Sequence, residues 1–173
     1  MIHPISNTLI LVLSFWVAAV QALPEDTQQE IRIASDKAFL DKPKGELIYT
    51  GNVRLNQGSL KIEADKVTII RDETGLKQVV AEGKPARYEQ VLNQDQEKTK
   101  AYGETIIYLT KSKQLTLLKN AGLQKQGNEF SGERIVYLID QQKVKAESPQ
   151  EDQRIRMVIQ PEQQKNSSES TKE

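Results

Sequence analysis

The sequence predicts an all-β fold in which short antiparallel strands are stacked into one long unit. Apolar segments repeat along the chain, and within them apolar and polar residues alternate as in half-buried strands. No stretch shows the periodicity of an amphipathic helix. Because a stack of this kind grows by adding layers, we expect its two ends to stay open.

An internal repeat supports this organisation. Four segments each begin with a small residue and an acidic residue and continue as an apolar run. The four acids are Asp36, Asp65, Glu104 and Glu133. They are 29, 39 and 29 residues apart, and a shift of 68 residues places Asn120 of the second half on Asn52 of the first. Self-similarity of this kind is typical of repeat architectures.

In the N-terminal half, alternation begins at 31–34 and is clearest at 60–64. Glycine, asparagine and proline punctuate the apolar runs, and they favour turns because of their backbone preferences. We therefore expect strands at residues 31–34, 37–40, 46–50, 53–56, 60–64, 67–71, 79–81 and 86–88. The turns between them are expected at 41–45, 51–52, 57–58, 72–75 and 82–85.

The C-terminal half repeats this plan after a wholly polar segment at 93–100, which we expect to be a loop. Apolar strands are expected at 103–109, 115–118, 132–138 and 154–159, with a turn at 119–121. Pro161 ends the last strand, since proline cannot donate to the ladder. The tail at 162–173 is entirely polar and is expected to be disordered.

The N-terminus is typical of a cleavable signal peptide. Residues 9–20 form an apolar run of 12, whereas a bilayer-spanning helix needs about 20. Val20 and Ala22 are small residues at the −3 and −1 positions of a cleavage site. We therefore expect a signal peptide at 1–22, a linker at 23–30 and a domain at 31–161, exported to the periplasm. An uncleaved anchor is the alternative, disfavoured because no Lys or Arg precedes the run.

Open ends and a long core suggest a binding or bridging protein more than an enzyme, and the composition agrees with this. The 24 Lys and Arg residues balance 24 Asp and Glu residues, which disfavours a nucleic-acid partner. There is no Cys, and His3 in the leader is the single His, so neither a metal site nor Cys/His catalysis is expected. Acidic pairs such as Glu25-Asp26 lie in turns or linkers, where solvated surface is the better interpretation. No cofactor is expected.

The inward-facing rows of the strands are the candidate binding surface. They are largely aliphatic, and composition alone leaves two interpretations open: a closed core, or a groove whose walls stay partly open to acyl chains. The candidate residues are Ile31, Ile33, Phe39, Tyr49, Leu55, Ile62, Val67, Ile69, Leu117, Leu123, Phe130, Ile135 and Tyr137.

Several segments resemble the OstA-like lipopolysaccharide-transport family. They are 31–36 (Ile-Arg-Ile-Ala-Ser-Asp), 49–53 (Tyr-Thr-Gly-Asn-Val), 57–67, 83–86 (Gly-Lys-Pro-Ala), 120–121, 132–137 and 154–161. The resemblance covers about 31–161 and implies a twisted β-jelly roll, slightly open along one side. It also implies head-to-tail self-association into a bridge that passes lipopolysaccharide across the periplasm, with acyl chains in the apolar groove.

The resemblance further implies roles for the two ends. The N-terminal edge, with Ile31 and Ile33, would meet an inner-membrane transport component. The last strand, with Ile155, Met157 and Ile159, would meet another copy or the outer-membrane translocon. Where the family often has an aromatic residue this chain has Arg87, which would pair with a lipid phosphate if it faces the groove and is surface otherwise. A membrane-anchored adaptor of the same system and a periplasmic glycan hydrolase are the alternatives.

Overall fold

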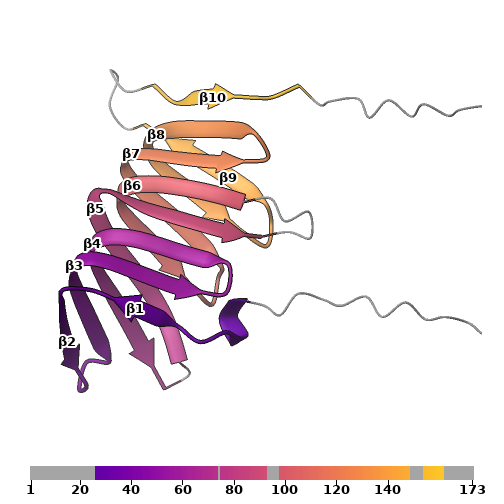
Figure 1. Ribbon diagram of the computed structural model, residues 1–173. Helices are drawn as coiled ribbons and strands as arrows, with labels where there is room; N and C mark the ends of the chain where they lie inside the picture. The colour runs from indigo at the N-terminus through magenta and orange to yellow at the C-terminus, as the bar shows by residue number, and fades with distance from the viewer. Residues whose placement is uncertain (1–25, 74, 93–97, 149–153, 162–173) are drawn as a thin grey trace, which may run out of the picture.

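The computed structural model describes residues 26–73, 75–92, 98–148 and 154–161, which are almost entirely antiparallel β-sheet (Figure 1). One short 3-10 helix, η1 (Asp26–Gln28), precedes the strands. The strands are β1 (Arg32–Ala34), β2 (Lys37–Asp41), β3 (Glu46–Gln57), β4 (Leu60–Asp72), β5 (Gly75–Val91), β6 (Lys98–Leu109), β7 (Gln114–Lys125), β8 (Asn128–Leu138), β9 (Lys143–Glu147) and β10 (Arg156–Val158). The prediction of an all-β fold is confirmed. The predicted signal peptide and tail lie outside the described residues.

Neighbouring strands along the chain pair with each other to form one continuous sheet. Its order is β1-β3-β4-β5-β6-β7-β8-β10. β2 pairs with the first part of β3 and β1 with its second part. At the other end, β10 pairs with the first part of β8 and β9 with its second part. Each end of the stack therefore presents two short edge strands, one along each half of the end strand (Figure 1). Within the described ranges, no helix has the length and apolar character needed to cross a membrane.

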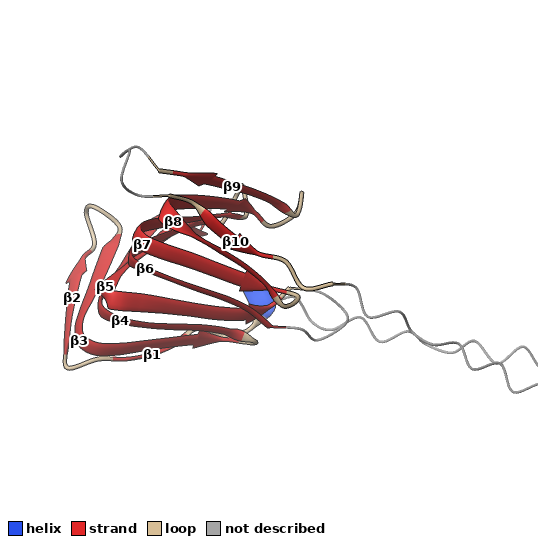
Figure 2. Cartoon of the chain, turned by 90° about the horizontal axis from the view of Figure 1, so that it is seen from above, coloured by secondary structure: helices blue, strands red, loops and turns tan. Residues whose placement is uncertain are grey.

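The long strands bend sharply near their middle. In β3 the register with β4 shifts between Thr50 and Val53, where Gly51 and Asn52 have φ of 86° and 46°. β7 has the same irregularity at Lys119 and Asn120, and β4, β5 and β6 shift register at matching positions. A bulge of this type bends a strand without ending it. Figure 2 shows the sheet folded along this line of corners.

The corners divide the sheet into two layers. Layer A comprises β2, β9 and the strand halves at 46–50, 66–72, 75–82, 105–109, 114–118 and 134–138. Layer B comprises β1, β10 and the halves at 53–57, 60–63, 86–91, 98–102, 121–125 and 128–132. The inward-facing hydrophobic residues of both layers form one buried cluster.

The predicted turns at 51–52, 82–85 and 119–121 are wrong, because these residues are corners inside continuous strands. Glycine and asparagine with positive φ occur both in hairpin turns and in bulges, so the sequence pattern alone does not separate the two. Each pair of short strands predicted around such a point is one long strand in the structure. The predicted loop at 93–100 is also too long, since 98–100 belongs to β6.

Candidate functional site

Two apolar walls face each other across the interior. In layer B the register aligns one inward row across the strands: Ile33, Leu55, Ile62, Tyr88, Ala101, Leu123, Phe130 and Met157. In layer A two such rows are aligned: Tyr49, Val67, Ala81, Ile106, Leu117 and Ile135, and beside them Leu47, Ile69, Val79, Tyr108, Leu115 and Tyr137. The walls run the whole length of the stack and meet at the corners.

The interior between these walls is packed. Eight predicted groove residues are at most 4% exposed: Leu55, Ile62, Val67, Ile69, Leu117, Leu123, Ile135 and Tyr137. Ile33, Tyr49 and Phe130 are half-buried against the same cluster. A cavity between the layer ends, lined in part by Leu92 and Tyr137, has a volume of about 10 Å³, the space of one water molecule. An apolar ligand that enters here must part the two layers.

Two of the predicted groove residues lie elsewhere. Phe39 is 62% exposed and pairs with Ile48, whose row faces outward from layer A, so its assignment to the inward row is wrong. In β2 the inward positions are Ala38 and Leu40, one residue away on either side, and a shift of one residue changes the face of a strand. Ile31 precedes β1 and is 39% exposed at the edge of the stack.

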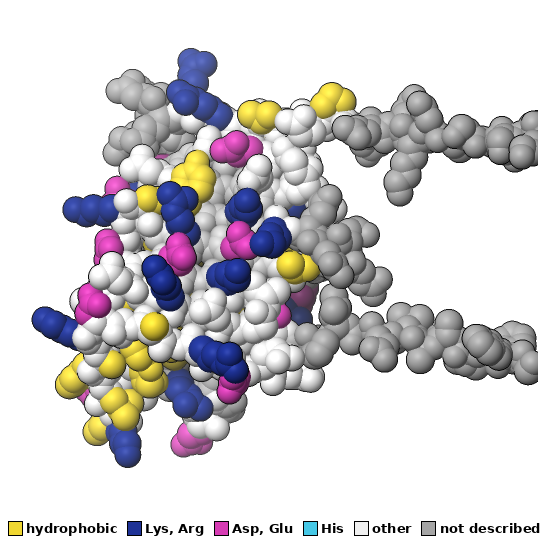
Figure 3. Space-filling view, in the orientation of Figure 1, with side chains coloured by type: hydrophobic (Ala, Val, Ile, Leu, Met, Phe, Trp, Pro, Cys, Tyr) yellow, Lys and Arg dark blue, Asp and Glu magenta, His cyan; other side chains and the backbone are white. Residues whose placement is uncertain are grey.

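Arg87 lies on the outer face of layer B. Its register partners are Glu63 and Tyr102, and it lines a surface depression together with Lys61 and Lys100. Figure 3 shows Lys and Arg interspersed with Asp and Glu over much of the face turned toward the viewer. Arg87 therefore does not face the groove, as a contact with a lipid phosphate there would require, and it is a surface residue.

A polar rim borders the apolar interior at the end of layer B opposite the corners. Its residues continue the inward alternation of their strands: Gln57, Gln90, Thr99, Lys125 and Asn128. Gln57 and Thr99 are buried, and the other three are half-buried. The inner surface is thus amphipathic, with aliphatic walls and a hydrogen-bonding margin. We name these five residues the rim.

The segment 26–29 is fastened to the rim by a carboxylate. Asp26 accepts hydrogen bonds from the Ser59 amide at 2.7 Å, the Ser59 hydroxyl at 2.6 Å and Gln90 Nε2 at 2.6 Å. Gln57 Nε2 donates to the backbone oxygen of Gln29 at 3.1 Å. Figure 2 shows η1 at the ends of the strands, away from the corners. This segment covers the N-terminal half of the rim.

The hydrogen-bond network continues into the core. The hydroxyl of Tyr88 donates to Gln90 Oε1, and Gln90 in turn donates to Asp26. Burial raises the pKa of Tyr88 well above its usual value, so the side chain stays a neutral donor. This network is not visible in the sequence, because Asp26 contacts residues 33 and 64 positions away. The expectation of a solvated Asp26 in a linker is therefore wrong.

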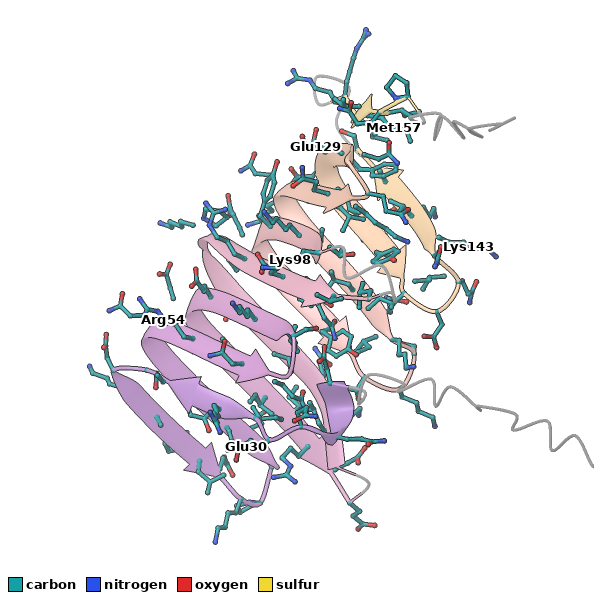
Figure 4. The ribbon with its side chains drawn as sticks, turned by 45° about the vertical axis from the view of Figure 1, so that its right-hand side comes forward. Glu30, Arg54, Lys98, Glu129, Lys143 and Met157 are labelled. Atoms are coloured by element: carbon teal, nitrogen blue, oxygen red, sulfur yellow. The ribbon has the colours of Figure 1, made fainter. Side chains whose placement is uncertain are left out.

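Both ends of the stack expose hydrophobic side chains beside unpaired strand edges. At the β2 end Phe39 and Leu40 are 62% and 51% exposed, and at the β10 end Met157 and Ile159 are 52% and 65% exposed. Figure 3 shows hydrophobic side chains gathered at these two ends, and Figure 4 places Met157 on β10. Exposed edges of this kind are templates for pairing with another strand.

Comparison with known proteins agrees with this architecture. Residues 32–143 match the family model described as LptA/(LptD N-terminal domain) LPS transport protein. The lipopolysaccharide export system protein LptH of Pseudomonas aeruginosa is 40% identical over an alignment of 166 residues, which covers 90% of this chain and 95% of that protein. The lipopolysaccharide export system protein LptA of Escherichia coli K12 is 34% identical over 149 residues, covering 83% of this chain and 80% of that protein.

A solved structure extends the likeness to three dimensions. The crystal structure of LptH, the LptA-homologous periplasmic component of the lipopolysaccharide transport device of Pseudomonas aeruginosa, superposes with a TM-score of 0.73 at 40% identity. The match covers 80% of this chain and all of that one. The resemblance inferred from short segments is confirmed over most of the sequence. The chain therefore belongs to the LptA/(LptD N-terminal domain) family of lipopolysaccharide transport proteins.

Proposed function

We propose that this chain binds lipopolysaccharide in the periplasm and passes it along its interior as one unit of a bridge between the two membranes. The observation that carries this proposal is the amphipathic inner surface, with two aliphatic walls, a polar rim and open strand edges at both ends of the stack. Acyl chains would lie between the walls, and the polar headgroup would stay at the rim.

The energetics of this arrangement are favourable for an acyl chain. Moving hydrocarbon from water into an apolar surrounding gains about 0.8 kcal/mol per methylene group. Entry costs the separation of the packed walls, whose long strands pass from one layer to the other at the line of corners. Opening about these corners would expose the walls while preserving the strand pairing within each layer, so most hydrogen bonds of the sheet would be kept.

The two ends of the stack are proposed to be the assembly surfaces. β1 and β2 would meet the inner-membrane transport component, and β9 and β10 would meet another copy or the outer-membrane translocon. Strand addition to an exposed edge supplies backbone hydrogen bonds and places side chains of the added strand in register. The exposed Met157 and Ile159 at one end, and Phe39 and Leu40 at the other, support a contact of this kind.

Lipid binding is tested by titrating the purified mature chain with lipopolysaccharide and measuring the change in tyrosine fluorescence or in hydrogen exchange of the inward rows. Saturable binding with loss of protection in those rows supports the proposal. A folded chain that shows no binding would contradict it. The mass of the exported protein tests the expected cleavage after Ala22.

Assembly is tested separately with Met157→Lys at the β10 edge, with Lys100→Ala on the outer face of layer B, away from both ends of the stack, as a control. We expect Met157→Lys to shift concentrated protein toward monomer in analytical ultracentrifugation, because an unpaired charge would be buried at the interface. Equal size distributions for the two variants would contradict an interface at this edge.

A further inference from the structure

Lys125 at the rim points inward. In the last part of β7 the inward positions are Ala121, Leu123 and Lys125, while Gln124 between them is exposed. The ammonium group of Lys125 lies 5.3 Å from the centre of the ring of Tyr137, which is itself 1% exposed in the opposite layer. The side chain therefore reaches from layer B across to layer A, over the aliphatic interior.

The backbone fixes this lysine in place. Lys125 and Asn128 are register partners that close a two-residue turn at Gln126 and Gly127. Both turn residues have positive φ, 50° and 74°, which is the conformation that matches the twist of a β-hairpin. A lysine at such a closing pair has a defined backbone position, and its side chain alone is free to adjust.

The charge of Lys125 is not neutralised within the described part of the chain. It is in none of the ion pairs found there, whereas neighbouring Lys98 pairs with Glu89 at 2.7 Å. Among the described residues that line the small cavity beside Lys125 are Thr99, Gln126 and Gln142, and none of these described lining residues is a carboxylate. A half-buried ammonium group beside an apolar interior and several neutral polar groups is suited to an anion.

We propose that Lys125 binds a phosphate group of the amphiphile's headgroup while the acyl chains lie between the layers. This assignment rests on the proposed function and deepens it, because it names the residue that distinguishes phosphorylated lipids from uncharged ones. On entry of a ligand the ammonium group would leave the Tyr137 ring and hydrogen-bond to phosphate oxygens. The hydroxyl of Thr99 and the amide of Gln142 line the same cavity.

The test compares Lys125→Gln with Lys100→Gln, a matched control on the outer face of layer B. Each variant and the wild type are titrated with lipopolysaccharide and with the same lipid after enzymatic removal of its phosphates. We expect Lys125→Gln to bind the phosphorylated form about tenfold more weakly, since a charge-assisted hydrogen bond is lost. Its affinity for the dephosphorylated form should not change, Lys100→Gln should bind both forms like the wild type, and Lys125→Arg should retain the preference.

Several results would overturn the assignment. If Lys125→Gln lowers the affinity for both lipids equally, Lys125 has a structural role against Tyr137. If it lowers the affinity for neither lipid, Lys125 is not part of the binding site. Competition by inorganic phosphate as effective as that by the lipid would show a site for a free anion. If the wild type binds neither lipid, the proposed function fails together with this inference, whereas the first two results leave lipid binding intact.

Discussion

Asn120 donates a hydrogen bond from Nδ2 to Oε1 of Glu104, which lies at the corner of the neighbouring strand, at 3.1 Å. Asn52 makes the same bond to Asp36 at 3.0 Å, with the same separation of 16 residues. These two pairs are related by the 68-residue shift seen in the sequence. The repeat is therefore a structural device as well as a sequence pattern, and in both halves an acid at the neighbouring corner holds the corner asparagine.

The corner at Asn120 yields a stability prediction. Its φ of 50° is tolerated by asparagine and glycine, but costs other residues roughly 1–2 kcal/mol. We expect the free energy of unfolding in urea to decrease slightly for Asn120→Gly, which loses the bond to Glu104. It should decrease by about 1 kcal/mol more for Asn120→Ala, which also carries the backbone strain. Equal free energies of unfolding for Asn120→Ala and Asn120→Gly would show that the positive φ at this corner is not the reason for an asparagine here.

The ring of Tyr102 covers Gly122 on the neighbouring strand. A Cβ atom at position 122 would lie 2.1 Å from Cζ of Tyr102, so the ring occupies the space that a side chain would need. We expect Gly122→Ala to displace the ring and to destabilise the protein by about 1 kcal/mol, the typical scale of an overpacked contact.

A double-mutant cycle tests this contact. Tyr102→Ala alone should also cost about 1 kcal/mol, and the double variant should cost about as much as either single one, because both remove the same contact. Additive losses in chemical denaturation would show that residues 102 and 122 act independently, contrary to the close approach in the structure.

Stability at high pH should depend on Tyr88. Burial raises the pKa of its phenol above 10.0 in the folded chain, so the unfolded chain loses this proton first as pH rises. The stabilisation is complete below pH 10.0 and declines as pH rises above it. We expect the loss of unfolding free energy between about pH 8 and about pH 11 to be smaller in Tyr88→Phe than in the wild type.

Tyr108→Phe is the matched control for this prediction. The pKa of Tyr108 is also raised, mainly by burial, but this phenol is 8% exposed whereas Tyr88 is 2% exposed. Tyr108→Phe should therefore reduce the loss of unfolding free energy at alkaline pH by less than Tyr88→Phe does. Parallel pH profiles for the wild type and Tyr88→Phe would contradict a buried, neutral Tyr88.

Asp26 should control local opening at the rim. In Asp26→Ala the amide of Ser59 loses its acceptor, and the hydroxyl that accepts from the Val91 amide at 3.1 Å loses its anchor. We expect hydrogen exchange at Ser59 and Val91 to become at least about tenfold faster, as expected when a hydrogen bond to a charged group is removed.

The control for Asp26 is Asp41→Ala. Asp41 accepts from the Lys44 amide at 3.2 Å in an exposed turn, so the same chemical change is made far from the rim. It should leave exchange at Ser59 and Val91 unaltered. Unchanged exchange at these two amides in Asp26→Ala would mean that the carboxylate does not fasten the segment 26–29.

Part of this structure could be predicted from sequence because period-2 alternation reports directly on the faces of a strand. Leu55, Ile62 and Leu123 were placed correctly on inward rows for that reason. Phe39 was misplaced because β2 is short and follows Ser35 and Asp36, so few residues define its phase. The corners at Gly51 and Asn120 have the sequence pattern of turns, because residues that tolerate a positive φ occur both where a chain reverses and where it bends.

The rim could not be predicted, for a different reason. Gln57, Gln90 and Lys125 come into one row only when the register across β3, β5 and β7 is known, and the sequence contains no signal for register between distant strands. Once the strands are aligned, the rim follows from simple alternation, since each of its residues continues an inward row. The role of Asp26 is hidden in the sequence for the same reason, because only the register of the strands brings Ser59 and Gln90 close to it.

Two phenylalanines allow a direct test of whether lipid lies between the layers. Phe130 is on the inward row of layer B, and Phe39 is an exposed, outward-facing residue of layer A. A photo-reactive phenylalanine analogue is placed at each position in the exported protein, and lipopolysaccharide adducts are measured in cells after irradiation. We predict an adduct at position 130 and none at position 39. Adducts at position 39 without adducts at 130 would instead mean that the lipid is held on the outer face and not between the layers.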